Sequence, residues 1–593
     1  MDWGQVKDMS RRIKKSGGPS KSAVAMTRPV GWMLGLGFLA AALSQANVQV
    51  VNRRTVMTNA LEKGRYEIED DLMARRGSIF SSDGMIMAQN QDVYRFQLFY
   101  DRLPKSPGFF AELSLATGIS VDDLRRPAML GEKKRAWKSP IVGSEAKAVR
   151  SLMRRWNADG VSLEKVLVRS YPLGWTASGI VGLVRADKAI NGLEKSLDSE
   201  MGGQDGEVRG FIDRTGAFMA VEDHDLQKLV QGKDVTLTID SILQNEASLA
   251  VRHAVESNNA ESGAAVAIDP KTGDILAMAN YPTFDPEGTI HDNEDMNVAY
   301  RALFEPGSTF KVMTLAKTLD MGGYGQHDRM QCGGSITVPG KTIRCSHGAH
   351  GDIDWEKAIA ESCNVAASRW AQKIGTAEMR QFVTDLGLLE KPNLGLPWEM
   401  AGRHNENDPA KAMQLANNGF GQAMNATPVA LASAYSSLAN GGIRMNPRLL
   451  SKVGDQETPV KEAGRIFSVE TSEYVRELMI ATIEKDFGTG KGLRISGYQL
   501  AGKTGTAQKL QGGRMVGYVS NFVGMVPAHD PKAVILVMIN DPKGGSYYGG
   551  SVAGPVFARL AKTVIRRYGI APDSERIPRG PKLPVEISAG DGR

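Results

Sequence analysis

The chain has 593 residues, of which 42% are hydrophobic and 23% charged, an ordinary composition for a globular protein. This length accommodates about three or four domains with substantial cores. The formal net charge of +6 is small for the length, and no basic stripe with interleaved aromatic residues stands out, so we expect no nucleic-acid partner.

The N-terminal region combines a basic stretch with an apolar one. Residues 1–28 are rich in Lys and Arg, and the run from Val30 to Ala46 is apolar, continuing more weakly to Val51. A cleaved signal peptide is one interpretation, but the run is longer than a usual signal core. A single spanning helix needs about 20 residues and fits better. The basic flank predicts a cytoplasmic N-terminus and places the rest of the chain outside.

The next region, to about Asp225, is mixed α/β and has no obvious catalytic cluster. Arg75-Arg76-Gly77 precedes a strand-like run and has the composition of a solvated turn. Gly192-Leu193-Glu194 opens a short helical pattern.

From Gly232 the pattern becomes more regular. Residues 234–240 alternate as a strand, and a helix is expected from Ser241 to about Ser257. Two strands are expected at 263–269 and 274–280, joined by a hairpin turn. Helices next to strands predict a sheet flanked by helices.

The most informative stretch runs from Glu305 to Thr314, a Pro/Gly turn leading into an amphipathic helix. Ser308 and Lys311 lie three residues apart and therefore share a helix face, where the lysine amine can lie against the serine hydroxyl. A desolvated lysine can take the serine proton and activate it as a nucleophile.

Ser-x-x-Lys alone is weak evidence, because it recurs at Ser144–Lys147 and Ser162–Lys165. Two further elements follow in order after Ser308, namely Ser362-Cys363-Asn364 and Lys503-Thr504-Gly505-Thr506. This trio is the signature of active-site serine penicillin-recognising enzymes. A second ordered set exists, but its last two elements leave no room for the helical lobe that must separate them; it comprises Ser162–Lys165, Ser257–Asn259 and Lys271–Gly273.

The remaining regions complete the domain. Residues 314–438 are expected to be mainly helical, with strands at 517–527 and 533–540 and a closing helix at 554–568. The proline-rich tail from Ala571 is predicted to be flexible.

Other chemistries have weaker support. Residues 497–504 match the phosphate-binding loop pattern, but neither a buried strand before it nor a helix after it is evident. No Gly-x-Ser-x-Gly elbow or His-Glu-x-x-His motif occurs.

The three cysteines leave two readings open. Cys332 and Cys345 could form a disulfide outside the cell, or Cys345 could bind zinc with His347 and His350. Cys363 is interpreted as a packed thiol, and no cofactor or catalytic metal is expected.

With these motifs in place, the chain resembles the class B penicillin-binding proteins over nearly its whole length. The resemblance implies a multidomain α/β architecture: a cytoplasmic tail (1–28), a transmembrane anchor (29–51), a mixed α+β pedestal or dimerisation-type domain (52–228), a transpeptidase domain (229–570) with an antiparallel sheet, flanking helices and a helical lobe, and a flexible tail (571–593). The stretches that carry it are Arg75–Gly77, Gly192–Glu194, 263–282, the Ser308 motif, Ser362–Asn364, Asn440–Gly442 and 501–507.

The resemblance also implies roles for the motif residues. Ser308 would attack the penultimate D-Ala carbonyl of a stem peptide, Lys311 would accept its proton, Ser362 would relay a proton to the leaving amine, and Asn364 would hold the peptide amide and Lys311. Lys503 would supply positive potential, and the Thr504-Gly505-Thr506 stretch would bind the substrate, with both threonine hydroxyls on its carboxylate. The backbone amides of Ser308 and Thr506 would form the oxyanion hole.

The implied function is a peptidoglycan D,D-transpeptidase that cross-links stem peptides and is inhibited by β-lactams. The residue at 364 and the sequence around Ser308 and Lys503 resemble the division (septal) subgroup more than the elongation subgroup. A multi-span membrane glycosyltransferase and other division proteins are the implied partners, at the bacterial cytoplasmic membrane. A D,D-carboxypeptidase, a β-lactamase or a β-lactam-sensing receptor of the same fold remain as alternatives.

Overall fold

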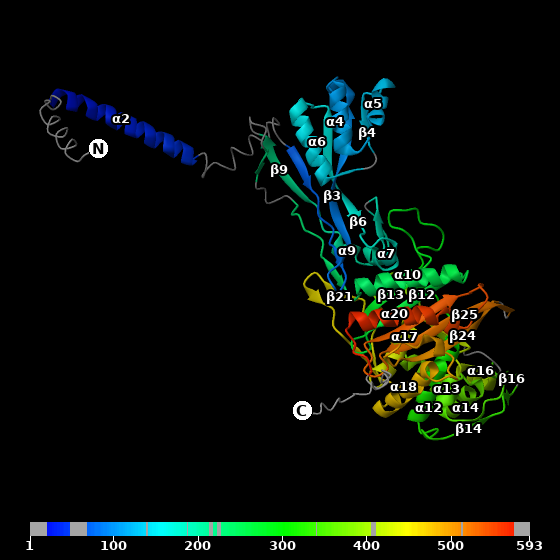
Figure 1. Ribbon diagram of the computed structural model, residues 1–593. Coiled ribbons are helices and arrows are strands. Elements are labelled where there is room, and N and C mark those ends of the chain that lie inside the picture. The colour runs from blue at the N-terminus through cyan, green and yellow to red at the C-terminus, as the bar shows by residue number, and fades with distance from the viewer. Residues whose placement is uncertain are drawn as a thin grey trace, which may run out of the picture. The chain divides into compact units, whose positions relative to one another are not determined.

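A computed structural model describes most of the chain (Figure 1). The described residues are 21–47, 68–137, 140–186, 188–212, 218–221, 227–339, 341–404, 411–511 and 514–573. They divide into two compact units, one formed by residues 1–73 and 204–230 and the other by 74–203 and 231–593. The expected tail at 571–593 falls almost wholly outside the described residues, as do most of the basic tail and the end of the expected anchor.

The first unit holds a helix and a small sheet. Strands β1 (Ile68–Leu72), β9 (Gly206–Ile212) and β10 (Phe218–Val221) pair antiparallel in the order β1-β9-β10. Helix α2 (Lys21–Ala46) begins before the expected anchor and covers most of it. Within the parts of the chain that the structure describes, none of the helices is both long enough and apolar enough to cross a membrane.

The N-terminal part of the second unit is built on a long antiparallel ribbon of β3 (Ile86–Phe99) and β6 (Val161–Ser170). Three helices cover one end of the ribbon, and Phe96, Phe109 and Leu113 lie in their shared core. The ribbon belongs to an eight-stranded sheet in which only β2 and β11 pair in parallel. The helices and the other strands are α4 (Pro107–Thr117), α5 (Val121–Met129), α6 (Gly143–Trp156), β2 (Ile79–Phe80), β4 (Lys134–Ala136), β5 (Ile141–Val142), β11 (Val235–Leu237), β21 (Leu450–Val453) and β22 (Gln456–Glu457).

A buried carboxylate ties two distant stretches of this region together. Glu194, in α8 (Gly192–Ser196), is fully buried and contacts the Nε atoms of Arg76 at 2.5 Å and Arg169 at 2.7 Å. Arg169 also donates to the Gly77 carbonyl oxygen at 2.8 Å. The expectation of a solvated turn is therefore wrong for Arg76, whose side chain is only 12% exposed. A buried ion pair of this kind fixes the positions of the segments it joins, because breaking it leaves an uncompensated charge.

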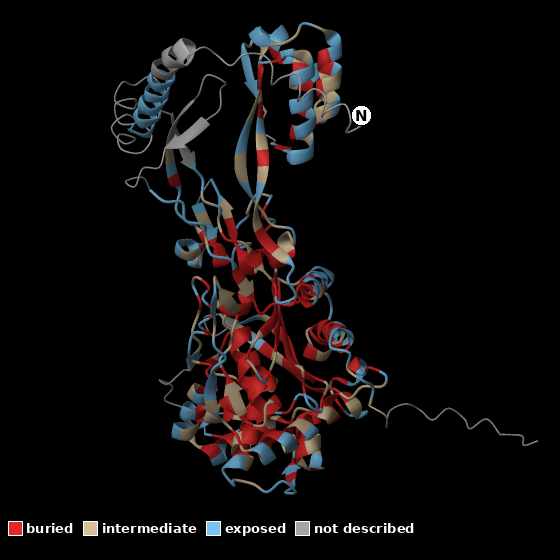
Figure 2. Cartoon of the chain, turned by 90° about the vertical axis from the view of Figure 1, so that its left-hand side faces the viewer, coloured by how far each residue is buried: buried red, intermediate tan, exposed pale blue. Residues whose placement is uncertain are grey.

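The C-terminal part is organised around a five-stranded antiparallel sheet in the order β13-β12-β26-β25-β24. Alternate residues of each strand point to opposite faces. On β12, for example, Ala265 and Ala267 join the core under α10 and α20, whereas Val266 joins the core under α12, α17 and α18. The sheet is thus buried on both faces (Figures 1 and 2). The bounds are β12 (Ser262–Ile268), β13 (Ile275–Tyr281), β24 (Ala501–Gln511), β25 (Arg514–Val526), β26 (Ala533–Asn540), α10 (Ser241–Ser257), α12 (Phe310–Asp320), α17 (Pro428–Ala439), α18 (Val469–Glu484) and α20 (Gly554–Arg567).

These bounds confirm the expected strands and helices of the sheet region to within a few residues, but one expectation was too simple. Between α12 and α17 the chain is not mainly helical throughout, because residues 330–353 form two small two-stranded sheets. This stretch is rich in Gly and β-branched residues, which favour turns and strands over helix. The elements are β14 (Met330–Cys332), β15 (Ser335–Val338), β16 (Lys341–Arg344), β17 (Gly351–Ile353), α13 (Trp355–Ala360), α14 (Asn364–Ile374), α15 (Thr376–Asp385) and α16 (Lys411–Asn418).

Candidate active site

Ser308 lies in a tight turn that leads directly into α12. Gly307 adopts a φ of 59°, and its amide donates to the Gly421 carbonyl oxygen at 2.9 Å. Thr309 Oγ1 donates to the Pro306 carbonyl oxygen at 2.8 Å, which closes the turn. Gly307 and Thr309 are buried, whereas Ser308 is partly exposed. The turn therefore presents the serine side chain at a surface while its neighbours are fixed.

Lys311, in the first turn of α12, is only 1% exposed. Its Nζ donates to Ser362 O at 2.6 Å, Ser362 Oγ at 3.0 Å and Asn364 Oδ1 at 2.6 Å. The sequence predicted contact with the Ser308 hydroxyl, but among the described residues the recorded hydrogen bonds of this amine go to the second motif. Burial lowers the pKa of Lys311 to about 8, because an ammonium is poorly solvated there.

Ser362 and Asn364 lie at the junction between α13 and α14. Ser362 has a φ of 60°, a left-handed conformation that is uncommon for a non-glycine residue and often found at functional sites. Cys363 caps α14 by accepting from the Ala366 amide. Asn364 Nδ2 donates to the Arg344 carbonyl oxygen at 2.7 Å, which orients the side-chain oxygen towards Lys311.

Lys503, on the edge strand β24, reaches the same hydroxyl from the other side. Its side chain is fully buried, and its Nζ donates to Ser362 Oγ at 3.1 Å and to the Thr504 carbonyl oxygen at 2.8 Å. Burial, followed by the proximity of Lys311, lowers the pKa of Lys503 well below its ordinary value. One serine oxygen thus accepts from two lysines, and their mutual repulsion favours a state in which at least one is neutral.

The third motif continues along β24. Thr504 Oγ1 lies 2.8 Å from Thr489 Oγ1, and Thr506 Oγ1 accepts from the Gly549 amide at 3.1 Å. Between them, Gly505 approaches Asn521 so closely that a Cβ would lie 2.1 Å from Asn521 Oδ1. Any larger residue there would clash with the buried Asn521 side chain, so that side chain or the edge strand would have to shift.

The structure brings all three predicted motifs together and leaves the competing patterns apart. Ser162–Lys165 lies on strand β6, where residues three apart face opposite sides. The Lys271–Gly273 stretch forms the turn between β12 and β13. Residues 497–504 run into strand β24 rather than a helix, which excludes a phosphate-binding loop.

Sequence reasoning missed two contributors to this site. Thr489 and Asn521 lie outside any short motif and contact the third motif only through the fold. Their side chains gave no local signal, because neither periodicity nor spacing marks them.

The arrangement can perform nucleophilic acyl chemistry. A partly exposed serine begins a helix, a buried amine with a pKa lowered to about 8 lies in the next turn, and a second hydroxyl is held between two amines. A neutral lysine can accept a serine proton, and the second hydroxyl can pass a proton onward.

Comparisons with known proteins agree with this geometry. Residues 263–562 match the penicillin-binding protein transpeptidase domain, and residues 71–237 match the penicillin-binding protein dimerisation domain.

Two relatives and one solved structure cover most of the chain. It is 30% identical over 535 residues to a probable peptidoglycan D,D-transpeptidase PenA of Neisseria gonorrhoeae, covering 88% of this chain and 87% of the relative. It is 31% identical over 422 residues to the peptidoglycan D,D-transpeptidase FtsI of Escherichia coli, covering 70% and 69%. The crystal structure of penicillin-binding protein 3 from Mycobacterium tuberculosis with aztreonam matches with a TM-score of 0.66 at 26% identity, covering 86% of this chain and 99% of that one. With both domain matches in their expected order, the chain belongs to the class B penicillin-binding proteins.

Proposed function

We propose that this protein is a peptidoglycan D,D-transpeptidase that forms an acyl-enzyme on Ser308. The observation that carries the proposal is the shared Ser362 oxygen, which accepts from the buried amines of Lys311 at 3.0 Å and Lys503 at 3.1 Å. This contact joins the three motifs into one proton-handling unit beside the serine turn. The names of the relatives and the transpeptidase domain match support the same activity.

In the proposed first half-reaction, Ser308 Oγ attacks the penultimate D-Ala carbonyl of a stem peptide. Lys311 takes the serine proton in its neutral form, and Ser362 passes a proton to the departing D-Ala amine. Asn364 keeps Lys311 in position through the 2.6 Å contact to its Nζ and binds the peptide amide. The amine of a second stem peptide then attacks the ester, which forms the cross-link and releases Ser308.

In this proposal the edge strand β24 binds the substrate. We assign the substrate carboxylate to Lys503 and the hydroxyls of Thr504 and Thr506, with Gly505 allowing the strand its close approach to Asn521. The backbone amides of Ser308 and Thr506 are the proposed oxyanion donors. A β-lactam resembles the D-Ala-D-Ala end and acylates the same serine.

The rate of Ser308 acylation is expected to rise with pH and to reach half its maximum near pH 8. The reason is that only neutral Lys311 can accept the proton, and burial places its pKa at about 8. Well below that pH the rate should fall about tenfold per pH unit. Stopped-flow acylation by a chromogenic cephalosporin between about pH 6 and pH 9 measures this profile; a flat profile would rule out Lys311 as the base.

Intact-mass analysis after incubation with a penicillin tests the function itself. The wild-type protein should carry one stable penicilloyl adduct, and Ser308→Ala should carry none. An adduct that disappears as the drug is consumed would indicate a β-lactamase. Release of D-Ala from a stem peptide without formation of a cross-linked dimer would indicate a carboxypeptidase.

We further propose the domain order given by the resemblance: a cytoplasmic tail (1–28), a membrane anchor (29–51), a pedestal (52–228), the transpeptidase domain (229–570) and a tail (571–593), with the catalytic domain outside the cytoplasmic membrane. The basic flank and the apolar run support the anchor. Large apolar side chains on α2 are also exposed, including Trp32, Leu34 and Phe38. The full chain should then stay with membranes through a carbonate wash, and its release by that wash would contradict the anchor.

We also infer a role in septal rather than side-wall synthesis, with a multi-span glycosyltransferase and other division proteins as partners. The support is the similarity to the FtsI and PenA relatives and the amino-acid sequence around the catalytic motifs. A fluorescent fusion should concentrate at the division site, and uniform labelling of the side wall would instead favour an elongation role.

A further inference from the structure

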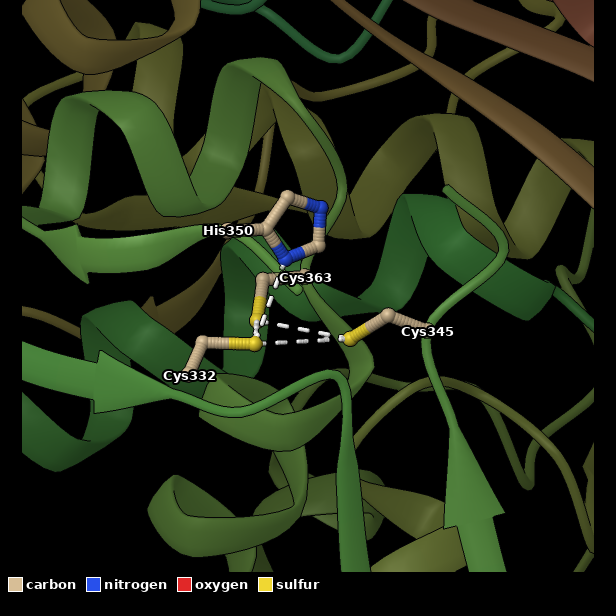
Figure 3. Close-up of side chains that lie close together, drawn as sticks. All are labelled: Cys332, Cys345, His350 and Cys363. Carbon is tan, nitrogen blue, oxygen red and sulfur yellow. Dashed lines mark hydrogen bonds between the residues drawn. The ribbon is translucent and has the colours of Figure 1, made fainter. Parts of the chain in front are cut away.

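A second cluster of chemically active side chains lies next to the catalytic motifs. Cys332, Cys345, Cys363 and His350 converge from four separate segments, with one potential ligand atom from each lying within 4.8 Å of all the others (Figure 3). The sulfur atoms are 3.4 Å apart for Cys332 and Cys363, 3.7 Å for Cys345 and Cys363, and 3.8 Å for Cys332 and Cys345. His350 Nδ1 lies 3.3 Å from the Cys332 sulfur.

These distances fit a shared metal ion rather than a disulfide. A disulfide requires a sulfur–sulfur distance of about 2.05 Å, and all three cysteines are free. A tetrahedral zinc with Zn–S bonds of about 2.3 Å places its sulfur ligands about 3.8 Å apart, and a histidine nitrogen about 3.5 Å from each sulfur. The observed separations lie close to both values. The disulfide reading of Cys332 and Cys345 is therefore wrong for this structure.

This set of ligands differs from the zinc site predicted from the sequence, which comprised Cys345, His347 and His350. His347 is exposed and is not part of the cluster, whereas Cys363 is fully buried within it. The His350 ring directs Nδ1 at the sulfurs and Nε2 towards Glu361, whose Oε2 lies 3.8 Å away. This separation is longer than a hydrogen bond, and Nε2 is buried without a hydrogen-bond partner among the described residues, so Glu361 is a neighbouring carboxylate of the kind often found behind histidines that bind metal.

The segments that bring the four side chains together are short and weak by themselves. Cys332 ends β14, Cys345 follows β16, His350 precedes β17, and Cys363 caps α14. Isolated two-stranded sheets are marginally stable in water. A metal that links both small sheets to α14 would supply the stability that their few residues cannot.

We propose that Cys332, Cys345, His350 and Cys363 bind one structural Zn²⁺ ion that positions the second catalytic motif. Cys363 lies between Ser362 and Asn364, and Cys345 directly follows Arg344, whose carbonyl oxygen accepts from Asn364 Nδ2 at 2.7 Å. Cys363 is thus the covalent neighbour of Asn364 itself, and Cys345 is the covalent neighbour of the residue whose carbonyl oxygen orients it. The ion holds the left-handed turn at Ser362, and through it the oxygen that both lysines contact.

A cleft lies beside the cluster. A cleft of about 450 Å³ is lined by His350, Glu361 and Lys357 together with His347 and Thr489. Among the four proposed ligands, His350 lines this cleft and the three cysteines do not.

The first test concerns the metal alone and does not depend on the proposed function. The purified full chain should contain one zinc per molecule, and zinc-free protein reconstituted with Co²⁺ should show thiolate-to-cobalt charge transfer and tetrahedral d–d bands. Metal-free protein with three titratable thiols, or with one disulfide by intact mass, would overturn the site. Zinc that is retained after His350→Ala, Cys332→Ser and Cys363→Ser would overturn the ligand assignment.

Matched variants separate binding from general damage. His350→Ala should lower zinc affinity at least about tenfold, and His350→Cys, which restores a fourth zinc ligand, should retain the ion. His347→Ala changes a neighbouring histidine outside the cluster and should leave zinc content and acylation unchanged. Equal zinc loss in His347→Ala and His350→Ala would contradict the assignment.

The positioning role rests on the proposed function and needs a separate measurement. Removing zinc with a chelator should lower the penicillin acylation rate about tenfold or more, and Zn²⁺ but not Mg²⁺ should restore it. The zinc-free protein should still show a cooperative melting transition of the sheet domain when it is monitored by near-UV circular dichroism. Acylation that is unaffected by zinc removal would overturn the positioning role while leaving the metal site intact.

Discussion

Replacing Lys311 with alanine is expected to lower the rate of Ser308 acylation by about 10³-fold, within the range for loss of a general base. The substitution removes the only buried amine on the serine helix and also releases Ser362 and Asn364, which its Nζ holds at 3.0 and 2.6 Å. The loss should appear in the acylation rate constant more than in the initial binding of the β-lactam, because the proton is transferred only as the bond forms.

Lys317→Ala on the same helix is the matched control. Lys317 forms an ion pair with Glu378 at 2.6 Å and has no contact with the catalytic motifs among its recorded interactions within the described residues. The Lys317→Ala variant should therefore be acylated at the same rate as the wild type. Equal losses in the two variants would show that any lysine removal damages α12, and the base assignment would fail.

Replacing Lys503 with methionine should reduce acylation efficiency by about 10²- to 10³-fold for a penicillin that carries its carboxylate. In the free protein, burial and then the neighbouring Lys311 lower the pKa of Lys503. An arriving carboxylate acts in the opposite direction, because an opposite charge in a buried site stabilises the ammonium. The lysine therefore becomes an anion receptor when the substrate binds.

A penicillin methyl ester provides the critical comparison. The ester lacks the carboxylate that pairs with Lys503, so Lys503→Met should lower its acylation efficiency by less than about tenfold. Lys509→Met, on the same strand and paired with Glu261, is the control and should leave both compounds unaffected. A loss of the same size for acid and ester would assign Lys503 to proton transfer through Ser362 instead of carboxylate binding.

The two lysines and the proposed zinc ion meet at Ser362. Its oxygen accepts from both amines, its backbone is left-handed, and the next residue is a proposed metal ligand. A strained turn persists only where its surroundings determine it, and here the surroundings are a helix cap, a buried lysine and the cysteine cluster. The second motif is thus the point at which stability and catalysis are most closely linked.

The sequence alone determined much of the catalytic domain. Hydrophobic periodicity placed the strands and helices around the sheet, because alternation and helical spacing are local properties of the chain. The ordered trio at Ser308, Ser362 and Lys503 was separable from its chance copies by spacing alone, since a helical lobe must fit between its elements. The resemblance to class B penicillin-binding proteins followed from those motifs.

Only the tertiary structure decided how the side chains are used. Arg76 proved to pair with the buried Glu194, Lys311 to contact Ser362 and Asn364, and Cys363 to lie in a cluster of possible metal ligands. Each of these contacts connects residues far apart in the chain, so no local pattern encodes it. Burial then sets the chemistry, because the same lysine or cysteine has a different pKa and different partners once water is removed from around it.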